Sequence, residues 1–190
     1  MKGKDSNRNK NLKLSMASIA VLLLSTALTL FTVTPVIAQA VKVEVNAPEY
    51  VEEGETFVVT INIINVTDLF SMQFDLSFDP DVVKIRDVQK GEISGEEFFT
   101  FMHQPIAEDT ERVLASMPFG KGVSGSGYLA EIEFKAKGEV GEKSELNLSK
   151  GMLGNISAGK ISAEWISSEI KIGEEKEEEG EEEEEEEVGE

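Results

Sequence analysis

The 190-residue sequence contains no cysteine, and this absence excludes several kinds of site at once. Without thiols the chain forms no disulfide, no thiolate nucleophile and no cysteine-based metal site. A domain that is exported without disulfides must be stabilised by its hydrophobic core, which is feasible for a domain of ordinary size.

Histidine is almost as scarce, because His103 is the only one. No serine nucleophile motif and no cluster of metal ligands accompanies it, so we interpret His103 as an ordinary strand or loop residue. Paired-carboxylate catalysis would need a cleft that the sequence does not reveal. Asp79, Asp81 and Asp87 are candidate calcium ligands, but they lack the ligand series and the glycine of an EF-hand loop. We therefore predict that the protein is not an enzyme and has no cofactor of its own.

Basic residues are few, with 18 Lys and Arg against 37 Asp and Glu. Residues 41–173 alone contain 12 basic and 23 acidic residues, a net charge of −11. Binding to phosphate backbones needs a basic patch, and none is visible. We predict no nucleic-acid partner.

Residues 1–40 have the organisation of a secretory signal peptide. A basic start, an apolar run over 14–33 and an A-x-A spacing at Ala38 and Ala40 follow one another in the expected order. An uncleaved N-terminal anchor is the alternative, because the apolar run is long for a signal peptide. Either alternative predicts a protein that is secreted or held at the cell surface, with no membrane contact outside this segment.

Residues 174–190 contain thirteen Glu and one Lys, a net charge of −12. Such a segment repels itself and buries almost no apolar surface. We predict a disordered acidic tail.

The segment 41–173 between these ends is predicted to be one all-β domain. Short alternating runs follow one another, separated by Gly, Pro and Asn turns, and no run keeps helical periodicity. "GVSGSG" at 122–127 is interpreted as a loop, since no helix follows that would make it a phosphate site. This pattern is typical of a β-sandwich or jelly roll.

The most regular alternation is "FSMQFDLSFDP" at 70–80. Met72, Phe74 and Leu76 would point to the core, whereas Ser71, Gln73 and Asp75 would point to the other face. The polar face is interpreted either as a recognition surface or as an ordinary solvated sheet face.

Aromatic residues raise the alternative of carbohydrate binding by ring stacking. Most lie on the apolar side of an alternating strand, and Trp165 shares a face with Ile161 and Ala163, which favours a core position. In "FFTF", Phe98 and Phe99 would lie on opposite faces, so at least one is expected to be exposed. No flat strip of exposed aromatics is predicted, and polysaccharide binding is therefore the second candidate function.

Three sequons, beginning at Asn65, Asn147 and Asn155, are candidate glycosylation sites in an exported protein.

Four stretches in order carry a resemblance to the cohesin family, the docking modules of bacterial cellulosome scaffolds. They are "VEEGETFVVTINIINV", "FSMQFDLSFDPDVVKI", "VQKGEI" and "GSGYLAEIEFKAKG", and the resemblance covers about residues 41–172. It implies a nine-stranded jelly-roll β-sandwich that docks a dockerin, a small helical partner that carries its own calcium. It also implies a role in assembling or anchoring exported proteins, such as those of polysaccharide catabolism.

The resemblance also implies which residues face the partner. Ser71, Gln73 and Asp75 fall on the docking sheet, and the neighbouring strand "RVLASM" adds Leu114 and Ser116 if Val113, Ala115 and Met117 point inward. Gln73 stands where a subgroup of the family carries an acidic residue, so the identity of the partner stays open.

Overall fold

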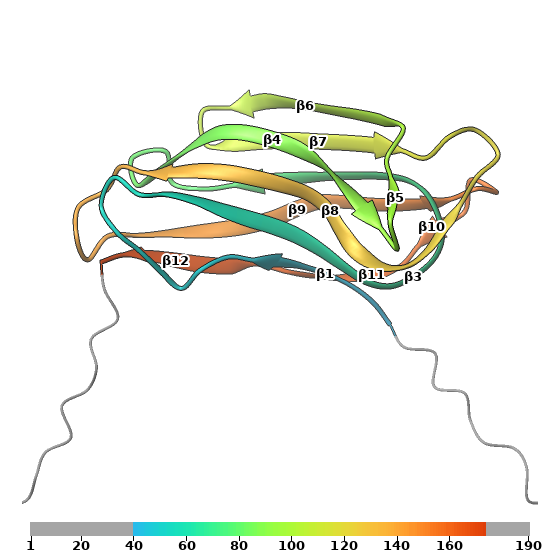
Figure 1. The fold of residues 1–190 in the computed structure, drawn as a ribbon, viewed down its shortest axis with the longest axis horizontal. Coiled ribbons are helices and arrows are strands. Elements are labelled where there is room, and N and C mark those ends of the chain that lie inside the picture. The colour runs from blue at the N-terminus through green and yellow to red at the C-terminus, as the bar shows by residue number, and fades with distance from the viewer. Residues whose placement is uncertain (1–39, 174–190) are drawn as a thin grey trace, which may run out of the picture. The chain divides into compact units, whose positions relative to one another are not determined.

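The computed structural model describes residues 40–173 (Figure 1). The predicted signal peptide, apart from its last residue, and the predicted acidic tail at 174–190 lie outside these described residues.

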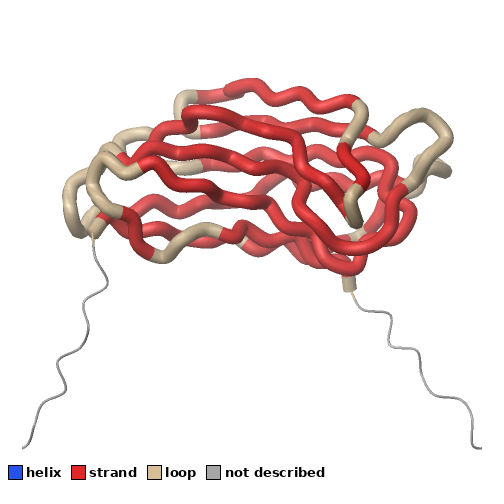
Figure 2. Tube along the Cα trace, viewed as in Figure 1, coloured by secondary structure: helices blue, strands red, loops and turns tan. Residues whose placement is uncertain are grey.

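The described domain consists of strands joined by turns and loops, without a helix in residues 40–173 (Figure 2). The prediction of an all-β domain is confirmed. The strands are β1 (Val41–Asn46), β2 (Tyr50–Val51), β3 (Thr56–Ser77), β4 (Val83–Ile93), β5 (Glu96–Glu97), β6 (Thr100–Ala107), β7 (Thr110–Ser116), β8 (Val123–Ala136), β9 (Lys143–Asn155), β10 (Lys160–Ile161), β11 (Ala163–Ile166) and β12 (Ser168–Ile172).

The expected count of nine strands is not confirmed. Residues 40–173 form twelve strands, of which β2, β5 and β10 have only two residues each. β3 is much longer than the other strands, with 22 residues in one continuous strand.

β3 connects the two layers of a curled sheet. Its first half pairs with β1 on one side and β8 on the other, and β8 continues to β4. Its second half, residues 69–77, lies between β7 and β9, and β7 continues to the edge strand β6. One chain segment therefore builds the centre of both layers (Figure 1).

The change of layer occurs where β3 contains two residues with left-handed backbone. Asn65 has φ 59° and Asp68 has φ 56°, and the pairing with β8 shifts register between Ile63 and Val66 and again before Leu69. Asn and Asp tolerate this conformation better than other side chains that have a Cβ, so the strand bends there without being interrupted.

The two layers are held together by a continuous apolar core. Phe134 of β8 stacks on Phe57 at 5.7 Å between ring centroids, and Phe78, just after β3, meets Phe134 edge-on at 5.5 Å. Met72, Phe74 and Leu76 are buried in this core, as the alternation predicts.

The interpretation of "GVSGSG" as a loop is wrong, because residues from Val123 onward belong to β8. Its glycines allow close backbone approach rather than flexibility. A Cβ on Gly127 would lie 2.1 Å from the carbonyl oxygen of Glu92 on the neighbouring strand, so no larger residue fits there without a backbone shift.

Candidate docking surface

The outward side of β6, β7, the second half of β3 and β9 carries three rows of residues that run across the strands. Residues directly opposite one another on paired strands point to the same face, so the strand registers define each row. We call them the small row, the methionine row and the charged row. The small row is Thr100, Ser116, Ser71 and Gly154. The methionine row is Met102, Leu114, Gln73 and Met152. The charged row is Gln104, Arg112, Asp75 and Ser149.

A groove of about 550 Å³ lies along the first two rows, and all eight of their residues line it. Ala158 and Gly159, in the turn that joins β9 to β10, and Lys160 of β10 also line the groove, and Lys160 is the one charged residue among its lining residues. Gly154 deepens the groove, because a Cβ at this position would lie 2.7 Å from the hydroxyl oxygen of Ser71. The small side chains of the small row therefore lie beside the larger side chains of the methionine row.

The two methionines of the methionine row are unusually exposed to solvent for apolar residues. Met102 is 60% exposed and Met152 is 53% exposed, at opposite ends of the methionine row. Leu114 lies between them and is partly buried. Exposed apolar surface gathered in a recess, rather than scattered singly, is typical of an interaction site.

The inward direction expected for the neighbouring strand is confirmed. Val113, Ala115 and Met117 are all buried, and Leu114 and Ser116 consequently point outward. Ser71, Gln73, Leu114 and Ser116 therefore come together on one groove.

Asp75 lies on the same face but differs from the other predicted residues. Its side chain is only 4% exposed, because the guanidinium of Arg112 covers it and donates two hydrogen bonds to its carboxylate, at 2.6 and 2.7 Å. Hydrogen bonding to Asp75 raises the pKa of Arg112. Asp75 does not line the groove.

The two rows that line the groove contain no charged side chain, and the charged row contains one mutually neutralising pair. This is unusual in a segment of net charge −11. Depletion of charge at the centre is a property of protein interfaces.

Sequence reasoning missed the contribution of Met102, Met152 and Gly154. The alternation on each strand shows which side chains share a face, but only the register between strands brings these three onto the face of Gln73.

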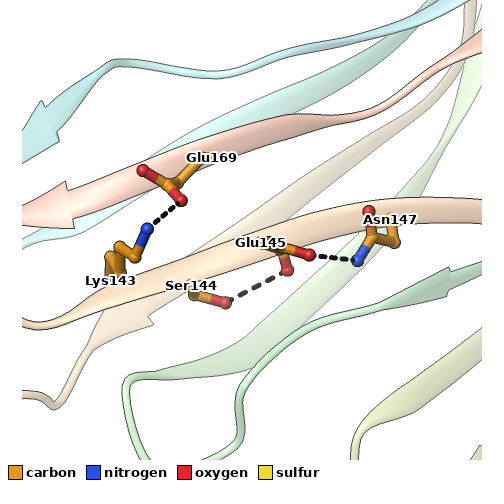
Figure 3. A network of polar contacts seen from close by, with 5 residues as sticks. All are labelled: Lys143, Ser144, Glu145, Asn147 and Glu169. Atoms are coloured by element: carbon orange, nitrogen blue, oxygen red, sulfur yellow. Dashed lines mark hydrogen bonds and ion pairs between the residues drawn. The ribbon is translucent and has the colours of Figure 1, made fainter.

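The sequon asparagines have different surroundings. Asn65 is exposed. Asn147 donates a hydrogen bond to Glu145 at 2.9 Å, in a polar network that also joins Lys143 to Glu169 at 2.8 Å (Figure 3).

Asn155 organises the turn beside the groove. Its side-chain oxygen accepts hydrogen bonds from the backbone of Ser157 at 3.0 Å and of Gly159 at 2.7 Å. Glycosylation at Asn65, Asn147 and Asn155 stays a prediction.

A second cleft of about 490 Å³ is lined by residues of β4 and β6 and by nearby segments. Here His103 lies 2.7 Å from the carboxylate of Glu111, which is buried. Glu111 therefore has a hydrogen-bond partner within the fold.

Within residues 40–173, no group of three or more His, Asp or Glu side chains is placed to hold a metal ion. The same part of the chain contains no helix long and apolar enough to cross a membrane.

Two exposed aromatic rings lie outside the groove. Phe119, in the loop after β7, is fully exposed, and Phe99, just before β6, is 77% exposed. Phe98 is buried, so the expectation that one ring of "FFTF" is exposed is confirmed. Trp165 is partly buried against the core, as expected.

The fold and the surface define the class of the protein as a β-sandwich with a charge-poor groove on one layer. The family model of the cohesin domain matches residues 41–172, and the chain belongs to this family. The resemblance found in the four sequence stretches is thereby confirmed.

Solved cohesin structures share this fold. The non-cellulosomal cohesin from the hyperthermophilic archaeon Archaeoglobus fulgidus is 18% identical, with a TM-score of 0.60 over 72% of this chain and 93% of the other. The seventh ScaB type I cohesin from Pseudobacteroides cellulosolvens is 19% identical, with a TM-score of 0.61 over 74% and 96%.

A further match is the Coh-OlpA–Doc918 structure, described as a novel type I cohesin–dockerin complex from Clostridium thermocellum. It is 15% identical, with a TM-score of 0.62 over 71% of this chain and 100% of the matched chain. At these identities the likeness shows the fold. No curated protein sequence matches the chain.

Proposed function

We propose that the protein is an exported, non-catalytic docking module whose groove binds a dockerin-bearing partner. The observation that carries the proposal is the pairing of an apolar groove with the absence of charge along its two rows. Membership of the cohesin family and the cohesin–dockerin complexes among similar structures support the choice of partner.

The methionine row and the small row would make different kinds of contact with the partner. The thioethers of Met102 and Met152 and the side chain of Leu114 supply apolar contact area, which gives most of the affinity in a desolvated patch. Ser71, Ser116 and Thr100 of the small row offer hydroxyl groups that can both donate and accept hydrogen bonds to fix the register. Gln73 adds an amide group, which can donate and accept hydrogen bonds, to the otherwise apolar methionine row.

The calcium of such a complex would belong to the partner, which would hold it in its own loops. Export would follow from the signal peptide expected at 1–40, and the role would be assembly or anchoring of other exported proteins.

The test is calorimetric titration of the full chain with a panel of dockerin modules, in calcium and again in excess EDTA. We expect at least one dockerin to bind with a Kd in the micromolar range or below, about −8 kcal/mol or more favourable. Binding should disappear in EDTA, since the partner then loses its fold. Failure of every dockerin in calcium would contradict the proposal.

Carbohydrate binding is the second candidate, and the exposed rings of Phe99 and Phe119 are the observation that favours it. It predicts retention of the full chain on insoluble polysaccharide and loss of retention in Phe119→Ser. Under the docking proposal neither effect is expected.

A further inference from the structure

The four methionines of the described domain fall into two pairs with different surroundings. Met72 and Met117 are buried in the core, at 4% and 2% exposure, whereas Met102 and Met152 are more than half exposed. Both exposed methionines line the same groove and belong to the same cross-strand row.

The chain contains no cysteine, so methionine thioethers are its only sulfur groups. In the described domain, the thioethers that solvent can reach are therefore concentrated at one surface. A leucine at either position would supply similar apolar area without a group that can be oxidised.

We propose that Met102 and Met152 form a paired oxidation site, at which a peroxide converts both thioethers to sulfoxides and thereby weakens partner binding in the groove. The effect on binding rests on the proposed docking function, but the location of the oxidation does not.

Each oxidation transfers one oxygen atom and two electrons. The sulfur lone pair attacks one peroxide oxygen, the O–O bond breaks and an S–O bond forms. The sulfur is oxidised and hydrogen peroxide is reduced to one molecule of water. Methionine sulfoxide can be reduced back by dedicated reductases, so the change is reversible.

Oxidation would make the methionine row more polar. A sulfoxide is polar and accepts hydrogen bonds, whereas a thioether is apolar and accepts them only weakly. On the sheet, Met102 lies opposite Leu114, whose side chain offers no donor. A partner that covers this row would bury a sulfoxide oxygen without a hydrogen bond from Leu114, and an unpaired buried polar group weakens binding.

The first arm of the test locates the oxidation without any partner. The full chain is treated with hydrogen peroxide for increasing times, the reaction is stopped with catalase, and peptides are mapped by mass spectrometry. We expect Met102 and Met152 to gain oxygen at least about tenfold faster than Met72 and Met117, because oxidation follows accessibility. Equal rates at all four positions would overturn the proposal.

The second arm measures binding after the peroxide has been removed, so that the partner is never oxidised. The probe is a dockerin that binds the untreated chain in the titration described above. We expect its Kd to rise about tenfold or more, equivalent to about 1.4 kcal/mol. A chain that carries both sulfoxides and keeps its original Kd would overturn the proposal.

Two variants separate the groove from the core. For Met102→Leu/Met152→Leu, the Kd after peroxide should equal that variant's own Kd before peroxide. Met117→Leu should retain the full loss of affinity, since Met117 is buried outside the groove. A double variant that still loses affinity on peroxide treatment would place the effect elsewhere and overturn the proposal.

The two levels of failure can be told apart. If no dockerin binds the untreated chain, the docking function fails and the effect on binding fails with it. Peptide mapping is independent of that result and still decides where the oxidation occurs.

Discussion

Asp75 on β3 and Arg112 on β7 lie directly opposite one another and form a two-point ion pair, with Nε and Nη2 of Arg112 donating at 2.6 and 2.7 Å. The pair neutralises the one charged row of the groove face and covers the Asp75 carboxylate. Asp75→Arg would therefore put two guanidinium groups side by side. We expect that variant to destabilise the fold, so a loss of binding in it would not identify Asp75 as a partner contact.

Removing the charge of Asp75 should lower stability measurably. We expect Asp75→Asn to lower the Tm by on the order of 5 °C, because Arg112 loses its charged partner at a nearly covered position. Thermal unfolding followed by circular dichroism measures this. Asp87→Asn, at an exposed position of β4, is the matched control and should shift the Tm by no more than about 1 °C. Equal shifts in both variants would contradict a structural role for the pair.

The turn next to the groove depends on Asn155. We expect Asn155→Ala to lose both backbone hydrogen bonds that the side chain accepts and to loosen residues 156–159, which should weaken dockerin binding several-fold. Asn155→Asp keeps an acceptor oxygen at the same position and should retain more affinity than the alanine variant. Titration of both variants with the same dockerin gives the comparison. A lower affinity in the aspartate variant than in the alanine variant would argue against this role.

Phe74 and Leu114 test the assignment of inner and outer faces. Phe74 is fully buried, so Phe74→Asp places a charge in the core and should leave the domain unfolded at 25 °C. Leu114→Asp introduces the same charge on the outward side of the adjacent strand, and that variant should remain folded while it loses partner binding. Circular dichroism and one-dimensional NMR distinguish the two outcomes. A folded Phe74→Asp variant would refute the face assignment.

The stability of the fold should depend on pH above pH 10 because of Tyr128. Burial, reinforced by the negative charges of Glu92, Glu131 and Glu97, raises the pKa of Tyr128 above the ordinary tyrosine value of 10.0. The folded state thus binds the phenol proton more tightly than the unfolded state does. This contribution to stability is complete below pH 10 and is lost as the pH rises through the folded pKa.

We therefore expect the stability of the wild type to fall more steeply above pH 10 than that of Tyr128→Phe, which lacks this proton. Urea unfolding from pH 8 to 11.5 measures the difference. Parallel stability curves for the two proteins would show that the phenol pKa is not raised by folding.

Single-strand patterns were sufficient to predict much of the fold. The alternation at 70–78 identifies Met72, Phe74 and Leu76 as core residues, because side chains on a strand change face at every residue. The same rule predicts the outward direction of Leu114 and Ser116. The order of four short motifs was enough to identify the cohesin family.

Properties that arise between strands could not be predicted in this way. The groove exists because the register brings Met102 and Met152 onto the row of Gln73, and no pattern within one strand contains that register. Likewise, Asp75 is buried because Arg112 covers it, and Arg112 lies 37 residues away in the sequence. The glycines of "GVSGSG" do not distinguish a loop from the start of β8, since glycine occurs both in flexible turns and in strands that approach a neighbour closely.

Gln73→Arg, compared with Gln89→Arg, tests the docking surface most directly. Gln73 is at the centre of the groove face, whereas Gln89 is exposed on β4 of the other layer. Both variants introduce the same charge on a strand and should stay folded. In titration with a dockerin that binds the wild type, we expect Gln73→Arg to lose at least about 2 kcal/mol of binding free energy. Gln89→Arg should bind as the wild type does. Equal affinities for the two variants would contradict docking at this groove.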